Sequence, residues 1–183
     1  MRNSWTYINS KYRYQFDYPP YYYASSNEPD NIYINPKEDY IKGLKTGEKG
    51  RERILITTEN DALSGGIETS KMAFSDFAFY SVQRSCTADG PGPLGWTSVS
   101  CDKVVKQSKF LNKYGLDVYE LYINSTRNDH KGDENKTVGP IFVLDVSRKT
   151  RITRALVVAG SFFEPLSGED EKIIREVVDY LRF

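Results

Sequence analysis

The only histidine, His130, lies in a polar segment that also carries three carboxylates. Asp129 precedes it directly, and Asp133 and Glu134 follow within four positions. One imidazole with carboxylates is a ligand set that can hold zinc or manganese weakly, whereas the spacing differs from that of an EF-hand calcium loop. The alternative is a solvated turn. A weakly bound divalent cation at these four residues is the one cofactor hypothesis.

Residues suited to acid–base or covalent catalysis are few. A Ser-His-Asp hydrolase would need His130 as its base, and a charged loop offers poor control of water and geometry. The sequence contains neither a Gly-x-Ser-x-Gly nucleophile motif nor a Gly-x-x-x-x-Gly-Lys-Ser/Thr phosphate loop. We therefore expect binding rather than catalysis, with no catalytic residue. A hydrolase whose carboxylates converge only in the fold is an alternative, since 25 residues are acidic.

Two cysteines, Cys86 and Cys101, flank a segment rich in glycine and proline. They lack the close spacing of a zinc or redox motif. A disulfide between them would close a loop of about 15 residues and stabilise the chain by about 3 kcal/mol. Two free thiols are the alternative that the residues alone leave open.

Three consecutive tyrosines, Tyr21, Tyr22 and Tyr23, are the candidate partner surface. They follow Pro19 and Pro20, which end a strand because neither can donate to a β-ladder. Tyrosine offers a broad apolar face with a polar tip, which suits a protein interface. The alternative is that one or two of these rings cover a sheet edge.

The elements that position these residues are mostly strands in antiparallel order. Alternation and turn signals predict the hairpin partners 103–110 with 116–123 and 139–146 with 154–163, the second strand of the latter pair being apolar on both faces. Helical spacing predicts a helix from about 71 to 84, capped by Thr69 or Ser70. A second helix begins after Ser167 and presents an apolar stripe at Ile173, Ile174, Val177, Val178 and Leu181. We therefore expect an α+β fold.

The N-terminal segment is the most distinctive part of the chain. Tyr12, Tyr14, Phe16 and Tyr18 alternate with polar residues, so the four rings share one face of a strand that Pro19 ends. This segment resembles the opening of PsbP-like proteins, which commonly reads Tyr-Gly-Phe-x-Phe-x-Tyr-Pro after a turn containing Asn. The sequence departs from that pattern at Arg13, where the family usually has Gly.

The resemblance implies one PsbP-like domain spanning residues 1–183, with a central, mostly antiparallel sheet flanked by helices as an α-β-α sandwich. It also implies a non-enzymatic exported accessory or binding protein, often a lipoprotein, that meets a protein partner at a membrane complex. Export favours the Cys86–Cys101 disulfide over two free thiols. An intracellular protein-interaction module of the same fold is a further alternative.

Composition limits the partners and the location. The 25 basic residues balance the 25 acidic ones, which argues against a nucleic-acid surface. No apolar run approaches the roughly 20 residues of a membrane span, so we expect no span in this chain. The first residues, Met1-Arg2-Asn3-Ser4, lack an apolar signal region. We expect an exported or cell-surface protein whose leader is absent from this chain, with a cytoplasmic location as the alternative.

Overall fold

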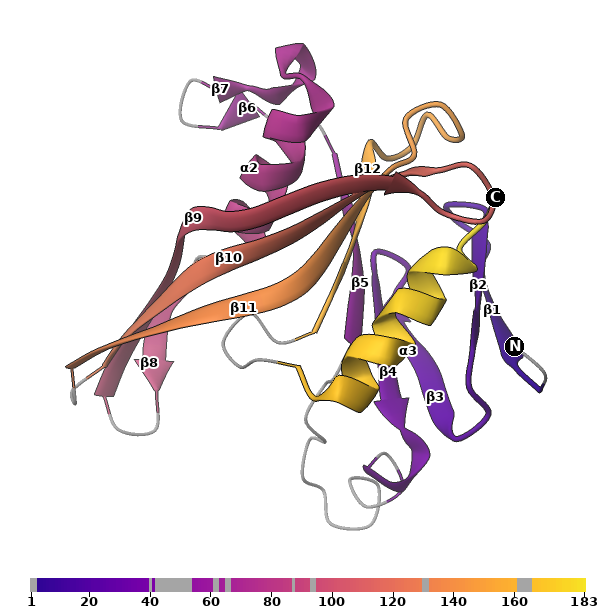
Figure 1. Cartoon of the computed structure of the whole chain (residues 1–183), viewed down its shortest axis with the longest axis horizontal. Helices are drawn as coiled ribbons and strands as arrows, with labels where there is room; N and C mark the ends of the chain where they lie inside the picture. The colour runs from indigo at the N-terminus through magenta and orange to yellow at the C-terminus, as the bar shows by residue number, and fades with distance from the viewer. Residues whose placement is uncertain are drawn as a thin grey trace.

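An eight-stranded antiparallel sheet forms the framework of the protein (Figure 1). The computed structural model describes residues 3–39, 41, 54–60, 63–64, 67–86, 88–92, 95–129, 132–160 and 166–183. The sheet order is β3-β4-β5-β12-β11-β10-β9-β8. The bounds are β3 Tyr22–Glu28, β4 Asn31–Pro36, β5 Ile54–Glu59, β8 Ala88–Gly92, β9 Gly95–Leu111, β10 Asp117–Asp129, β11 Gly132–Asp145 and β12 Ala155–Ala159.

Four smaller strands, the 3-10 turn η1 and the helices α2 and α3 are the other elements with defined bounds, and residues 37–39 and 41 are also helical. Strands β1 and β2 pair with each other, as do β6 and β7. Their bounds, and those of the 3-10 turn η1 and the two α-helices, are β1 Trp5–Asn9, β2 Tyr14–Tyr18, β6 Leu63–Ser64, β7 Ile67–Glu68, η1 Thr69–Lys71, α2 Phe74–Cys86 and α3 Gly168–Asp179. No helix among the described residues is long and apolar enough to cross a membrane.

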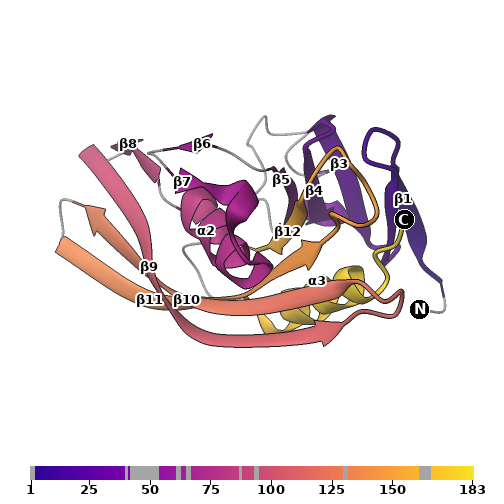
Figure 2. The same cartoon turned by 90° about the horizontal axis from the view of Figure 1, so that it is seen from above.

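The two α-helices pack on opposite faces of the sheet, and strand β12 shows why. Leu156 and Val158 belong to the apolar core beneath α3, whereas Ala155, Val157 and Ala159 belong to the core beneath α2. Because successive side chains of a strand point to opposite faces, a strand that is apolar throughout must be covered on both. This confirms the expected central strand. Figures 1 and 2 show α2 and α3 on either side of the long strands.

The expected α-β-α sandwich is wrong, because the fold is dominated by strands. Its two α-helices have 13 and 12 residues. A helix of that length is about 18–20 Å long and about 10 Å wide, whereas eight strands about 4.8 Å apart span roughly 34 Å. One helix on each face therefore cannot form a layer. Strands β9 to β11 extend well beyond both helices (Figure 2), and the β1–β2 hairpin covers part of the α3 face.

The β1–β2 hairpin joins the core through its aromatic face. Tyr14, Phe16 and Tyr18 are buried in the α3-side core, and so is Tyr12 from the turn that precedes β2. Arg13, in the turn directly before β2, has φ = +60°, a conformation that glycine adopts most readily. The backbone of Gln15 exchanges two hydrogen bonds with that of Arg182, of 2.8 and 2.9 Å. The C-terminal segment therefore adds to the hairpin edge.

The helix predictions differ in accuracy. In α3, Ser167 is the N-cap and its hydroxyl accepts from the Asp170 N–H at 3.1 Å, and the predicted apolar stripe is buried. Helix α2 begins at Phe74, three residues later than predicted. Its expected cap residues instead lie in η1, which the Met72 N–H closes by donating to the Thr69 carbonyl at 3.0 Å.

Candidate functional site

The predicted cation ligands lie at the tip of the β10–β11 hairpin. The backbone of Asp129 ends β10, and the exposed residues Asp133 and Glu134 lie near the start of β11. Glu134 pairs with Lys136 at 3.0 Å. His130 and the side chain of Asp129 fall outside the described residues, so the cation site stays a prediction. Among the side chains that the structure describes, no three of His, Cys, Asp or Glu are placed to hold a metal ion.

The predicted cysteine pair is confirmed at disulfide distance. Cys86 ends α2 and Cys101 lies in β9, with their Cα atoms 5.9 Å apart. Both are buried in the α2-side core. The bridge therefore ties the last turn of the helix to the sheet on which it packs.

The three consecutive tyrosines have different environments. Tyr21 is 55% exposed, Tyr22 is 2% exposed and Tyr23 is half-buried. The Tyr22 hydroxyl donates to an Asp170 carboxylate oxygen at 3.1 Å, which ties β3 to the first turn of α3. The exposed part of the predicted surface is therefore Tyr21.

Trp5 and Tyr21 form what we call the aromatic patch, with Lys37 joining them. The backbone N–H of Lys37 donates to the Tyr21 carbonyl at 2.9 Å. Its ammonium lies 3.6 Å from the centroid of the Trp5 indole ring. Trp5 is itself 49% exposed and meets the ring of Tyr18 edge-on. Two large exposed rings are thus held on ordered strand ends.

An acidic cavity adjoins the aromatic patch. Its volume is about 430 Å³, and its lining residues are Tyr21, Tyr22, Pro36, Lys37, Glu38, Asp39 and Glu169. Three of these residues carry carboxylates and one carries an ammonium. Because the Lys37 ammonium lies against Trp5, the cavity has the polarity to receive a cationic side chain.

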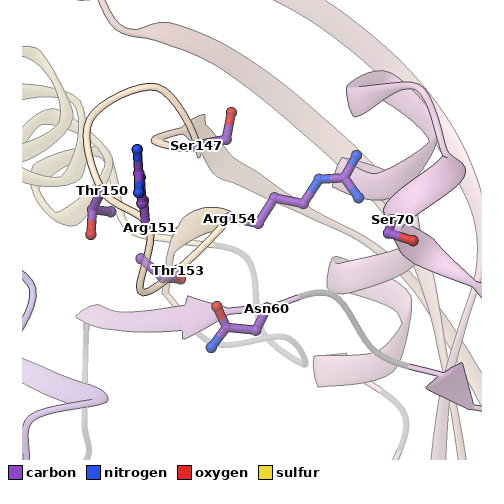
Figure 3. A pocket seen from close by; sticks show the side chains of 7 residues that line it. All are labelled: Asn60, Ser70, Ser147, Thr150, Arg151, Thr153 and Arg154. Carbon is purple, nitrogen blue, oxygen red and sulfur yellow. The ribbon is translucent and has the colours of Figure 1, made fainter.

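A second cavity, which we call the basic cavity, lies beside the η1 turn and the β11–β12 connection. Its volume is about 480 Å³, and its lining residues are Asn60, Ser70, Ser147, Thr150, Arg151, Thr153 and Arg154. Figure 3 shows Arg154 reaching toward Ser70, while Arg151 extends from the turn and Asn60 lies at the end of β5. The described lining contains two guanidinium groups and no carboxylate.

Two buried glutamates form matching ion pairs outside both cavities. Glu59 of β5 meets Arg84 of α2 at 2.9 Å and accepts from the Ser85 hydroxyl at 3.0 Å. Glu120 of β10 meets Arg175 of α3 at 2.6 Å and accepts from the hydroxyl of Ser108 at 3.0 Å. Each glutamate is 8% exposed.

The pKa values of the two glutamates move in opposite directions. Burial raises the pKa of Glu59, and the neighbouring charge of Arg84 offsets only part of that effect. Burial also acts to raise the pKa of Glu120, but the hydrogen bonds from Arg175 and Ser108 prevail, so this pKa lies below its ordinary value.

Sequence reasoning missed the basic cavity and the role of Trp5. The β11–β12 turn, residues 147–154, contains four basic residues and no acidic one, and that bias was a usable signal. Asn60 and Ser70 gave no such signal, because only the fold brings them to this turn. Trp5 gave no signal either, because the exposure of a strand residue cannot be predicted from one aromatic ring.

The chain matches no protein-family model and no curated protein. The residues of the chain and their geometry are therefore the basis for its function.

Proposed function

We propose that this chain is a non-enzymatic accessory protein that binds a protein partner through the aromatic patch. The observation that carries the proposal is the exposure of Trp5 and Tyr21 on either side of Lys37. Tryptophan and tyrosine are enriched among the residues that dominate binding energy at protein interfaces. Both rings have fixed neighbours, so little side-chain freedom is lost when a partner covers them.

The acidic cavity suggests the chemistry of the partner. Glu38, Asp39 and Glu169 border the same surface as Tyr21. A partner segment that places an apolar side chain on the rings and a lysine or arginine in this cavity would match both features. Complementary charge of this kind guides partner choice and speeds encounter.

The exported role rests on the PsbP-like resemblance and has two supporting observations. The Cys86–Cys101 pair is of a kind that persists in oxidising compartments. Arg13 has a positive φ at the position where those proteins usually have Gly, so the residue that departs from the pattern keeps a conformation suited to glycine. On this basis we place the partner at a membrane-bound complex outside the cytoplasm.

The hydrolase alternative has less support from the described residues. Glu59 and Glu120, the two buried glutamates, each face an arginine and line neither cavity. Glu38 and Glu169 do line a cavity, but both residues are exposed. Neither therefore has the water-poor surroundings that favour a general acid.

The proposal is tested by capture from a membrane fraction, with the chain carrying a photo-crosslinking residue at position 8, an exposed position of β1 that lines neither cavity. A Trp5→Ala/Tyr21→Ala variant should lose a crosslinked partner that the unsubstituted chain retains. Tyr114→Ala is the matched control, because Tyr114 is 46% exposed and lies outside the patch. Loss of an interfacial aromatic pair should weaken binding by about 30-fold or more.

Two outcomes would contradict the proposal. If the double variant and the Tyr114→Ala control capture the same protein equally, the aromatic patch does not bind it. If the chain turns over an ester, phosphate or glycoside substrate, and one carboxylate substitution abolishes this without unfolding the chain, the protein is an enzyme.

A further inference from the structure

We infer that the basic cavity is a binding site for an oxyanion, with a phosphate group as the best-matched ligand. This site is separate from the aromatic patch and lies beside α2, whereas the patch and its acidic cavity border β3 and α3. The inference rests on which donors line the cavity, how they are held and where the nearby carboxylates are engaged.

Two of the lining side chains offer donors without a partner among the described residues. The Arg151 guanidinium and the Asn60 amide each line the cavity from a different segment. No described residue forms a hydrogen bond or ion pair with either side chain. A guanidinium presents several N–H groups in a fixed fork that matches the oxygens of a phosphate, and the amide adds a neutral donor.

Arg154 is already held in place. Its guanidinium donates to the carbonyl oxygens of Thr69 and Met72, the latter at 2.8 Å, and lies 4.1 Å from the centroid of the Phe77 ring. The two carbonyls and the ring hold the guanidinium in place. An oxyanion entering the cavity would therefore meet a prepositioned cation and lose little of its affinity to ordering that side chain.

Three carboxylates near the cavity each have a partner among the described residues. Glu59 faces Arg84, Glu68 accepts from Ser70 and pairs with Lys71, and Asp145 accepts from Ser147 at 2.6 Å. Ser70 and Ser147 line the cavity, and because both hydroxyls donate to these carboxylates, they are not donors to an anion. The guanidinium and amide groups are therefore the anion donors of this site.

The surrounding turn adds positive charge. Arg148 and Lys149 are exposed residues of the same β11–β12 connection, and a local excess of cations raises the concentration and arrival rate of an anion. A volume of about 480 Å³ lies in the range of pockets that take small organic ligands. The space therefore admits the phosphate of a small phosphorylated molecule as well as the free ion.

Calorimetric titration of the whole chain at fixed ionic strength tests this inference, with inorganic phosphate and glycerol 3-phosphate as separate probes and glycerol as the uncharged comparison. Arg151→Gln should weaken phosphate binding by about tenfold or more, since it removes a charge-assisted donor. Arg148→Gln is the matched control: it removes the same charge from the same turn without touching the lining, and should change binding by less than about twofold.

The two probes distinguish the source of the phosphate group. Tighter binding of glycerol 3-phosphate assigns the site to a phosphorylated small molecule, and equal binding assigns it to the free ion; both support an oxyanion site. Absence of heat with either probe would overturn the inference. Equal weakening by Arg151→Gln and Arg148→Gln would also overturn it, because the effect would then be general attraction to a basic turn. Asn60→Ala supplies a second variant, and should weaken binding without any change in charge.

Discussion

Each face of the sheet holds a buried glutamate paired with an arginine, but the pKa of the glutamate is raised on one face and lowered on the other. On the α2 side, Glu59 meets Arg84 and a serine, and the pKa of the glutamate is raised. On the α3 side, Glu120 meets Arg175 and a serine, and the pKa is lowered. Both glutamates are 8% exposed. The presence of an arginine therefore does not decide how a buried carboxyl titrates.

The two pairs differ in the balance between burial and the action of the arginine: burial outweighs the charge of Arg84 at Glu59, whereas hydrogen bonds outweigh burial at Glu120. Arg175 also donates to Glu171 at 2.8 Å and to the Tyr122 hydroxyl at 3.2 Å, so its guanidinium is held against Glu120 from two sides. No other described partner holds the side chain of Arg84, which is 47% exposed. A carboxylate that accepts hydrogen bonds from a held guanidinium is compensated more for lost water than one on which the guanidinium acts mainly through its charge.

Removing the disulfide should have the largest effect and act on the α2 side alone. Cys86 directly follows Ser85, so a Cys86→Ala/Cys101→Ala variant frees the end of the helix that carries Arg84. We expect the free energy of unfolding to fall by about 3 kcal/mol, from the loop of about 15 residues that the bridge closes. We also expect the Glu59 pKa to return toward its ordinary value as water enters.

Urea denaturation measures the first effect, and carboxyl NMR titration measures the second with Glu120 as the internal control. A comparable shift of the Glu120 pKa would show that the two faces do not respond separately.

Shortening Arg175 should have the next largest effect. An Arg175→Met variant leaves Glu120 buried without its cation, and we expect a loss of about 2 kcal/mol, below the cost for a fully buried pair because Arg175 is 40% exposed. An Arg84→Met variant should lose about 1 kcal/mol or less, because Glu59 already binds its proton more readily. Chemical denaturation at neutral pH measures the free energy of unfolding of both variants. Equal losses would show that the two arginines stabilise the fold to the same extent.

The pH dependence of stability should have opposite signs for the two glutamates. Because the folded pKa of Glu120 lies below its ordinary 4.5, its contribution is present above pH 4.5 and is lost as the pH falls through the folded pKa. Because the folded pKa of Glu59 lies above 4.5, its contribution is present below pH 4.5 and is lost as the pH rises through the folded pKa.

Denaturation of Glu120→Gln and Glu59→Gln between about pH 3 and 8 measures both slopes. Relative to that of the unsubstituted chain, the free energy of unfolding of Glu59→Gln should increase as the pH rises. That of Glu120→Gln should decrease. Slopes of the same sign in both variants would refute the comparison.

Removing one hydroxyl should have the smallest effect. Tyr122→Phe deletes an acceptor of Arg175 and leaves the ring in place, so we expect a loss of about 0.5–1 kcal/mol. Tyr119→Phe, three positions earlier in β10 and packed against the α2-side core, is the control. The Glu120 pKa should rise slightly in the first variant only, and an unchanged value would mean that Tyr122 does not help to fix the guanidinium.

The sequence predicted individual strands and helices better than the balance between strand and helix in the fold. The apolar stretch containing Leu156 and Val158 was predictable as a covered strand because both of its faces are apolar. The stripe through Val177 and Val178 was equally clear. The number of strands that pair into one sheet was not predictable, because β5 pairs with β4 and with the much later β12 through contacts that local patterns do not carry. The α-β-α expectation failed for that reason.

The candidate sites divide in the same way. Tyr21 and Tyr22 have the same side chain and neighbouring positions, so no pattern could assign one to the surface and the other to Asp170. Arg151 belongs to a basic turn that the sequence displays, but Asn60 reaches the same cavity from a distant strand. The chemical character of a segment can be predicted from the sequence, but which distant segments meet at one site cannot.

The pairing of Gln15 with Arg182 has a consequence for synthesis. A ribosome releases the first hairpin long before residue 182, yet the edge of that hairpin gains its outer hydrogen bonds only from the C-terminal segment. The aromatic face of β2 must also wait for α3, which supplies part of the core that covers it. This hairpin is therefore made well before the segments that complete it, and until they are made its exposed rings are open to aggregation and need protection.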